Sequence, residues 1–423
     1  MTKELPLSQE VTTSHAAEIV RFALKVGEHL EINGGEVSRV EDTVARICRA
    51  YGATRVDVFA ITSVIIVTAI WHGDVVITQS RRVKGVEKNT ARLEAINAVS
   101  RAVCSHPMPL DEAKKKLNEA LTVGNLTKIR FLIGSLIATV SYAAFFGGDW
   151  KDVLVTFGAT FMIVLCQFVN NYLGGNRILS NVMCCFFAGL AATALCFWTG
   201  ASLDMVMAGC IMVLIPGISM TSAVENLILG DTLSGWTGLM EALMTALALA
   251  GGFALSQLMI GDLLANSAAA VVSNGTLYKI IQILTSFTGS IGFSLLFGLH
   301  GKQLPVAAIG AAMTWGVYLL AALCGCGDFS ANVIAAIFAA GYTELFVRVL
   351  KVPKTVLTFS VVVSLIPGRA LYNTMNHAIK GDFANFAQNG LTALTVAAAI
   401  GIGITVVLVA MQFWMKLHRK KRA

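Results

Sequence analysis

Long apolar runs separated by short polar stretches dominate the chain from residue 128 to its end. A helix needs roughly 20 apolar residues to cross the hydrocarbon core of a bilayer. Measured against that length, the pattern predicts ten membrane spans, of which the ninth is short for a straight crossing. The predicted spans are 131–148, 153–170, 182–203, 205–220, 240–260, 280–299, 304–325, 331–349, 355–368 and 391–415.

The first 127 residues carry a different pattern. Apolar residues recur at the spacing of an amphipathic helix, and β-branched runs then follow, bounded by turn residues such as His72-Gly73-Asp74. This order predicts a small α+β domain. Its predicted elements are a helix from about Ile19 to Gly34-Gly35, a second helix from the capping box Ser38-Arg39-Val40-Glu41 to about Tyr51, strands at 55–62, 64–71 and 75–82, and helices at 87–103 and 111–121.

Composition separates the same two regions. Of the 423 residues, 56% are hydrophobic and 13% charged, whereas soluble domains carry about 25% charged residues. This balance excludes an ordinary cytosolic enzyme, a nucleic-acid-binding protein and a disordered chain, and it indicates an integral membrane protein. Residues 1–127 hold 16 Lys+Arg and 15 Asp+Glu. The first twenty residues lack the apolar core of a signal peptide, so we expect the N-terminal domain in the cytoplasm.

Basic residues in the short loops predict the orientation. If Lys128 and Arg130 are cytoplasmic, that side carries 12 Lys+Arg and the other side carries 4. Both termini of a multi-pass plasma-membrane protein are therefore expected in the cytoplasm. The basic tail at 416–423 is read as a topology signal, and binding of anionic lipid is the alternative.

Matching motifs indicate that the membrane part is duplicated. Ile215-Pro216-Gly217 and Ile366-Pro367-Gly368 lie 151 residues apart, and Gly230-Asp231 and Gly381-Asp382 share that offset. Five spans per copy is an odd number, so the second copy enters the membrane from the opposite side. We expect a mainly α-helical polytopic membrane protein, with about ten transmembrane helices as a 5+5 inverted repeat, preceded by the α+β domain. The predicted divisions are 1–127, 128–262, 279–415 and 416–423.

The two Pro-Gly steps end the fourth and ninth predicted spans. Proline removes a backbone donor, and the freed carbonyls need protein or water around them, so such steps often line the substrate path of a transporter. The helix ends and the polar residues after them suit a small zwitterion or organic acid. Ordinary solvated loops are the alternative. The candidate substrate-binding residues are Pro216, Gly217, Ser219, Thr221, Ser222, Asn226, Pro367, Gly368, Tyr372 and Asn373.

Carboxylates near the membrane interior are candidates for proton coupling, because desolvation raises the pKa of a carboxylate toward neutrality. Asp231 is the first choice, with Asp382 as its repeat partner, and a plain capping role is the alternative. Glu241 opens the fifth predicted span, where it could also cap the helix, and Glu225 follows the first break. Glu344 lies in the eighth span and is expected to pair with Arg348 at i, i+4.

Other candidate sites give weaker signals. Cys184-Cys185 and Cys324-Gly325-Cys326 resemble metal ligands, but no nearby His or further Cys completes a tetrahedral set, so no metal or cofactor is expected. An odd count of nine Cys suggests no disulfide framework. His72, Asp74 and Asp57 would suit a membrane-tethered hydrolase, but no nucleophile stands at a recognisable spacing. Without a Walker loop, direct use of ATP is not expected.

Three groups of residues resemble the threonine/serine exporter family of bacterial membrane proteins, and the match covers nearly the whole chain. At 222–226, this chain has Ser-Ala-Val-Glu-Asn where the family has an Asn-Ala-Ile-Arg-Asp type of run. The three groups are Asn33-Gly34-Gly35-Glu36-Val37-Ser38-Arg39-Val40-Glu41-Asp42 with Tyr51-Gly52, then Ile215-Pro216-Gly217 with Gly230-Asp231, Ser234-Gly235 and Glu241, and finally Ile366-Pro367-Gly368.

The resemblance implies a secondary exporter, not an enzyme. In this family a soluble region precedes ten spans, and some members split the two membrane halves between two chains. The implied function is export of a small carboxylate-bearing metabolite by alternating access, driven by the proton motive force. Threonine or serine is the first substrate, and a dicarboxylate such as succinate is the second, because the split relatives are linked to dicarboxylate export. The implied partners are the substrate, protons and the lipid bilayer, without nucleic acid, and a homo-oligomer is compatible.

Overall fold

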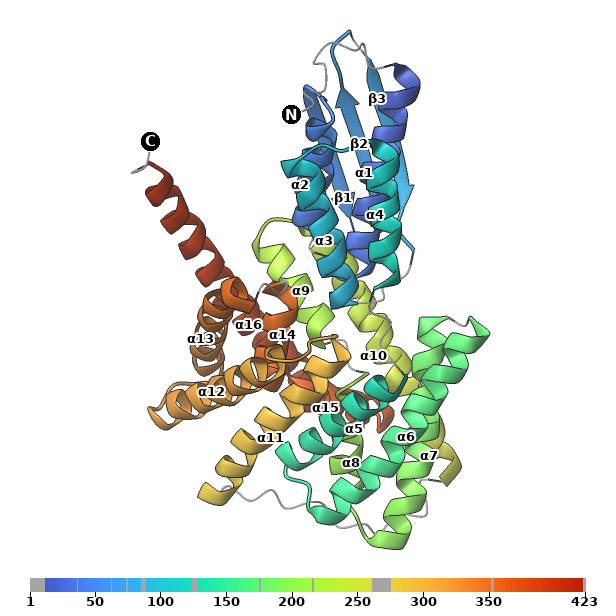
Figure 1. Ribbon diagram of the computed structural model, residues 1–423. Coiled ribbons are helices and arrows are strands. Elements are labelled where there is room, and N and C mark those ends of the chain that lie inside the picture. Colours follow the sequence, from blue (N-terminus) through green and yellow to red (C-terminus); the bar gives the residue numbers. More distant parts are fainter. Residues whose placement is uncertain are drawn as a thin grey trace. The chain divides into compact units, whose positions relative to one another are not determined.

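The computed structural model (Figure 1) divides the chain into two compact units, residues 1–126 and residues 127–423. We describe each unit by itself. The residues that the structure describes are 12–35, 37–61, 63–73, 75–84, 89–123, 128–174, 176–214, 217–260, 275–350 and 354–420.

The N-terminal unit packs four helices with a three-stranded antiparallel sheet of order β1-β2-β3. Alternate residues of the central strand are buried, which is typical of a sheet with one covered face. The sequence-based prediction of a small α+β region is therefore confirmed. The elements are α1 Thr13–Ile32, α2 Val37–Ala50, β1 Arg55–Ile61, β2 Val64–Ile70, β3 Val76–Arg82, α3 Thr90–Ser105 and α4 Leu110–Thr122.

The ends of these elements follow the turn residues, with one exception. Gly34 ends α1 with a φ of 93°, and Gly73 turns between β2 and β3 with a φ of 81°, both in the region that favours glycine. The capping box predicted at Ser38 is wrong, because α2 already begins at Val37. The carboxylate of Glu41 instead accepts a hydrogen bond from the backbone N–H of Ala60, at 2.8 Å, and so ties α2 to β1.

The membrane unit is entirely helical over its described residues. Eight of its helices are long and apolar enough to cross a bilayer, or nine if one bent pair counts as a single span. The predicted count of ten is therefore not reached in the part of the chain that the structure describes. The elements are α5 Lys128–Phe145, α6 Trp150–Leu173, α7 Arg177–Thr199, α8 Leu203–Ile211, α9 Gly217–Ile228, α10 Thr232–Ile260, α11 Thr276–Leu296, α12 Gln303–Leu323, α13 Asp328–Leu350, α14 Lys354–Val362, the 3₁₀ turn η2 Val363–Leu365, α15 Gly368–Ile379 and α16 Phe383–Lys420.

The fourth predicted span, 205–220, accounts for the difference in count. Its place is taken by α8, a helix of 9 residues, and by α9, which begins at Gly217. Ile215 and Pro216 lie outside the described residues. Hydropathy alone predicted one span over 205–220, because the apolar run continues through α8 and the polar residues of α9 follow only after the Pro-Gly step.

Helix bounds recur at the offset found in the sequence. Adding 151 to the bounds of α7, α8 and α9 gives 328–350, 354–362 and 368–379, which are the bounds of α13, α14 and α15. The first residues of α10 and α16, 232 and 383, differ by 151 as well. We call residues 128–260 the first half and residues 275–420 the second half.

The repeat-equivalent helices α5 and α11 pack side by side and run in opposite directions (Figure 1). Ser141 near the end of α5 bonds Thr288 at 2.8 Å, and the Phe145 carbonyl at its very end accepts from Tyr278 at the start of α11, at 2.9 Å. A Cβ on Gly292 would collide with the backbone nitrogen of Ala138, so this close approach requires glycine.

Candidate substrate route at the broken helices

The second half contains a helix broken by a proline. α14 continues as η2, and α15 starts directly after Pro367, with a bend of 61° between the two parts. Pro367 has a φ of −75°, and its carbonyl accepts the N–H of Leu371 at 3.0 Å, so the ring occupies the N-cap position of α15. A proline is tolerated there, because the missing N–H would have no helical partner.

The sequence-based interpretation of this step was therefore incomplete. Pro367-Gly368 was predicted to end the ninth span, but the chain continues beyond it as a helix. The polar stretch from Arg369 to His377 lies on α15 and is not a loop. The alternative interpretation as solvated loops is wrong for this stretch and for residues 219–226, which lie on α9.

The break of the second half contacts the end of α8 in the first half. Met212 directly follows α8, and a Cβ on Gly368 would collide with its sulfur. Gly368 is buried, and so is Met212. The contact therefore joins the Pro-Gly step of one half to the helix that precedes the Pro-Gly step of the other.

A phenol–carboxylate hydrogen bond joins the same two elements. The hydroxyl of Tyr372 on α15 donates to the Oδ1 atom of Asp204 on α8, at 2.9 Å. Tyr372 is 1% exposed, and its ring packs against Phe253 of α10. On α15, Gly368 contacts the end of α8 and Tyr372, further along, contacts its beginning, so α15 runs antiparallel to α8.

Asp204 was not among the predicted site residues. An acid in the first turn of a helix is usually read as a favourable interaction with the helix dipole. Its partner lies 168 residues away, so no local sequence signal links them. Tyr372 was predicted as a site residue from its position after the break. A buried phenol needs a hydrogen-bond acceptor, and this requirement was the one available signal that pointed to a partner such as Asp204.

Buried hydroxyl groups surround the break of the second half. The Ser364 hydroxyl in η2 bonds the Tyr142 hydroxyl at 3.0 Å and the Ser286 hydroxyl at 2.5 Å. One turn earlier, Ser290 of α11 donates to the carbonyl of Ser360, at 2.7 Å. These side chains supply polar partners where the helix departs from its regular path, which lipid could not do.

The remaining predicted substrate-binding residues lie on α9 and α15. Thr221 is buried, whereas Ser219, Ser222, Asn226 and Asn373 are partly exposed. Gly217 begins α9, and Pro216 lies outside the described residues. Met220 of α9 and Ala370 and Leu371 of α15 belong to one apolar cluster, which α10 and α16 complete.

The repeat-related acids Asp231 and Asp382 both cap the helix that follows them. Asp231 accepts the backbone N–H of Ser234 at 3.2 Å, at the start of α10. Asp382 accepts the backbone N–H and the side-chain amide of Asn385, at 3.3 and 2.6 Å, and lies 3.1 Å from the Nδ1 atom of His377. These contacts, those from Asn385 above all, lower the pKa of Asp382 below its usual value.

Two other predicted acids form ion pairs that the sequence did not indicate. Glu241 does not open a span, because α10 begins at Thr232; it forms an ion pair with Arg177 of α7, at 2.5 Å, with both side chains half-exposed. Glu344 pairs with Lys354 at 3.2 Å, and the side chain of Arg348 lies outside the described part. Glu225 is partly exposed on α9.

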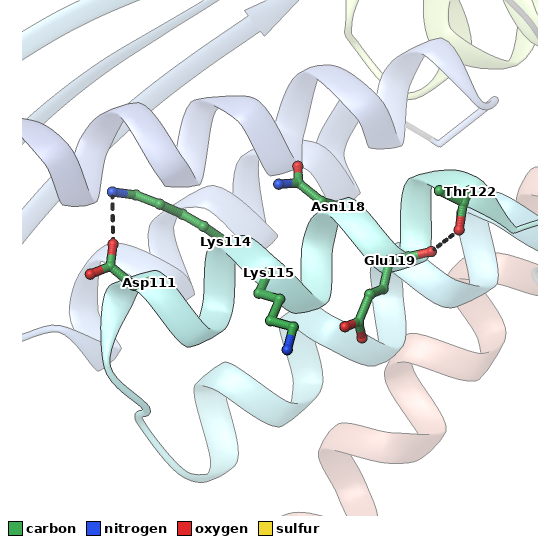
Figure 2. A pocket seen from close by; sticks show the side chains of 6 residues that line it. All are labelled: Asp111, Lys114, Lys115, Asn118, Glu119 and Thr122. Atoms are coloured by element: carbon green, nitrogen blue, oxygen red, sulfur yellow. Dashed lines mark hydrogen bonds and ion pairs between the residues drawn. The ribbon is translucent and has the colours of Figure 1, made fainter.

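No group of three or more potential metal ligands occurs among the described residues. A hollow of about 510 Å³ lies on α4 of the N-terminal unit (Figure 2). Its charged side chains form local pairs, such as Lys114 with Asp111 at 3.5 Å, and do not converge on a common point (Figure 2). The hollow is a solvated helix face. It is lined by Asp111, Lys114, Lys115, Asn118, Glu119 and Thr122.

Comparison with known proteins matches nearly the whole chain. The family described as "Putative threonine/serine exporter" matches residues 21–259, and the family described as "Threonine/Serine exporter, ThrE" matches residues 282–410. A Corynebacterium glutamicum protein named "Threonine/serine exporter" is 24% identical over 417 residues, which cover 94% of this chain and 84% of that protein. A Mycobacterium tuberculosis protein named "Probable threonine/serine exporter" is 22% identical over 405 residues, covering 92% and 76%. No solved structure matches this chain.

Proposed function

The chain belongs to the threonine/serine exporter family, and from this membership we propose that it exports threonine or serine by alternating access driven by the proton motive force. Family and helices together make it a multi-pass membrane protein that exports small metabolites. The amino-acid substrate follows the printed names of the relatives. Export of a dicarboxylate is the second candidate, because the split relatives are linked to dicarboxylate export. Glu225 and Asn226 replace a basic and an acidic residue of the family pattern, which changes the local charge and argues against assigning threonine alone.

The contact between the break of the second half and the end of α8 in the first half supports this proposal. Alternating access needs two related elements, one from each half, whose contact can rearrange around a central site. The contact of Gly368 with Met212 joins such elements. The antiparallel packing of α5 with α11 supports an inverted repeat, because a two-fold axis that relates antiparallel helices lies perpendicular to them.

Substrate recognition is assigned to the starts of α9 and α15. The N-terminal ends of helices carry partial positive charge, which favours the carboxylate of an amino acid. Hydroxyl and amide groups one or two turns further along can bind the ammonium and hydroxyl groups. The proposed residues are Pro216, Gly217, Ser219, Thr221, Ser222 and Asn226 of the first half, and Pro367, Gly368, Tyr372 and Asn373 of the second.

Proton coupling is assigned first to Asp231, then to Glu241, Glu225 and Asp382. The hydrogen bond from Ser234 to Asp231 is compatible with both capping and coupling, since a carboxylate can cap a helix and still exchange a proton. Asp231→Asn keeps the shape of the side chain. We expect this variant to lose efflux driven by a pH gradient while it still exchanges substrate for substrate. Full pH-driven efflux by the variant would move the assignment to Glu241.

Counterflow in proteoliposomes tests the function itself. Vesicles loaded with unlabelled threonine, serine, succinate or malate are diluted into the labelled compound, and exchange identifies the substrate class. Pro367→Ala should lower the exchange rate at least about tenfold, since a closed helix removes the break. Pro305→Ala is the matched control, because Pro305 lies in the first turn of α12 and breaks no span. Exchange of none of the four compounds by the wild type would refute the proposal.

Orientation completes the proposal, with both termini in the cytoplasm of a cell-membrane protein. The bias of 12 basic residues to 4 supports this orientation. Single Cys labels at Ser8 and Ala423 should react only after the membrane is permeabilised. Reaction of a label at Ala423 in intact cells would mean an odd number of spans.

A further inference from the structure

We propose that the hydrogen bond between Tyr372 and Asp204 is a latch that closes the transport route at one end of the membrane unit. This end, which we call the Asp204 end, is where α5 stops at Phe145 and α8 starts at Leu203. This proposal rests on the proposed transport function. The hydrogen bond is formed in the state described here, and it breaks when the route opens at this end.

The bond joins the two elements that alternating access must separate. Asp204 lies on α8 of the first half, and Tyr372 lies on α15 of the second half, directly after its break. Tyr372 is fully enclosed by protein, whereas Asp204 lies at an exposed position in the first turn of α8. When the bond breaks, water at the end of the helix can solvate the carboxylate, so opening leaves no stranded charge.

Further contacts between the halves lie at the same end. An Nη1 atom of Arg369 on α15 donates to the carbonyl of Phe146, at 3.3 Å, directly after α5. The hydroxyl of Tyr278 donates to the carbonyl of Phe145. Arg369 and Tyr372 lie one turn apart on α15, so its first turn carries two of these contacts between the halves.

The opposite end has different residues at the equivalent positions. Adding or subtracting 151 relates Asp204 to Thr355, Tyr372 to Thr221 and Arg369 to Ile218. Whatever hydrogen bonds the two threonines form, neither can supply a carboxylate. Hydrogen bonds to charged groups are stronger than neutral ones. The hydrogen bond between the phenol of Tyr372 and the carboxylate of Asp204 therefore has no carboxylate-bearing equivalent at the related positions of the opposite end.

A native thiol can report the opening of the latch. Cys196 lies near the end of α7, just before α8 begins at the Asp204 end, and is 1% exposed. A membrane-impermeant, charged methanethiosulfonate reagent can reach it only if the Asp204 end opens. Peptide mass spectrometry distinguishes Cys196 from the other eight cysteines.

The experiment compares labelling of Cys196 in Tyr372→Phe, Asp204→Ala and the wild type, in right-side-out and inside-out vesicles without substrate. Loss of a charge-assisted bond should raise the open population, and with it the labelling rate, about tenfold. Asp204→Asn keeps an acceptor without the charge and should show a smaller rise. Tyr318→Phe is the matched control, because Tyr318 also bonds an aspartate, Asp328 at 3.4 Å, but within one half.

Unchanged labelling in Tyr372→Phe and Asp204→Asn, with wild-type unfolding temperatures, would overturn the latch. An equal rise in Tyr318→Phe would also overturn it, since that result means general loosening. If Asp204→Ala does not fold, the other two variants decide. Counterflow on the same vesicles separates the two proposals. Exchange by the wild type together with unchanged labelling of the variants refutes the latch alone. Increased labelling of the variants without exchange of any substrate by the wild type refutes the transport function alone.

Discussion

The two halves of the membrane unit share their helix bounds but differ in the chemistry of their contacts. α8 and α14 have the same length and relative position, and so do α9 and α15. Yet Tyr142 has Phe293 as its equivalent and Ser364 has Val213, so the hydrogen bond between Tyr142 and Ser364 has no equivalent at the related positions. The comparison teaches that the repeat fixes the path of the chain, while the polar groups make the two ends of that path unequal.

The strongest test of the shared path replaces Gly292, whose equivalent in the first half is Ser141. Gly292→Leu should abolish recovery of folded protein, because the new side chain would meet the backbone of Ala138 and the carbonyl of Gly134, which cannot move aside. Gly316→Leu is the control, since a Cβ on Gly316 has nothing within 4 Å. Size-exclusion chromatography in detergent measures the outcome. Normal recovery of Gly292→Leu would mean that α5 and α11 are not closely packed.

A second test makes the two ends more alike. Thr355→Asp places a carboxylate at the equivalent of Asp204, in the first turn of α14, where an acid is compatible with the helix dipole. We expect a stronger closure at that end, worth about 1 kcal/mol, and therefore roughly fivefold faster labelling of Cys196. Thr355→Asn, which adds no charge, is the control. The inequality of the ends would lose its basis if the two variants behaved alike.

A third test exchanges the aromatic residues at equivalent positions of α5 and α11. Tyr142→Phe should lower the free energy of unfolding by about 1 kcal/mol, because Ser364 keeps its bond to Ser286. Phe293→Tyr should cost more, about 1–3 kcal/mol, because Val213 replaces Ser364 as the equivalent partner and the new hydroxyl would be buried without a bond. Unfolding in detergent measures both. Equal costs would mean that the two sites offer the same polar partners.

The smallest effect is expected at the repeat-related caps. The pKa of Asp382 is lowered in the folded state, so its stabilising contribution is present above its usual pKa of 3.8 and is lost as the pH falls through the lowered value. The unfolding temperature of the wild type should therefore decrease as the pH is lowered from about 5 to about 2–3, a range that spans the ordinary pKa of a carboxylate. Asp382→Asn should fall less over the same range, and Asp231→Asn, its equivalent, provides the comparison. The assignment fails if Asp382→Asn shows the full acid sensitivity of the wild type.

Sequence patterns predicted the membrane class, the small α+β region and the family, because apolar run length and strand alternation are local signals. The offset of 151 was also visible in the sequence, since the Pro-Gly and Gly-Asp steps mark chain positions directly. The continuation of the helix beyond Pro367 was missed, because proline is compatible with both the end of one helix and the first turn of the next.

Contacts between distant parts of the chain could not be predicted in this way. Glu41 was assigned to a cap but binds Ala60 of β1. Glu344 also contacts Lys354 at the start of α14, a partner that the sequence did not indicate. Both of these partners come from a neighbouring element in space. Asp204 is the clearest example, because its role depends on Tyr372 in the other half of the unit.

The packing of α5 against α11 bears on how such a protein can be encoded. These helices lie on opposite sides of the connecting residues 261–274, and their contacts are direct, through Ser141 with Thr288 and through Gly292. If the chain were divided in that connection, the same contacts would form an interface between two different subunits. Assembly would then depend on the concentrations of both subunits. Fusion into one polypeptide instead fixes a one-to-one stoichiometry and removes the need to balance the synthesis of two genes.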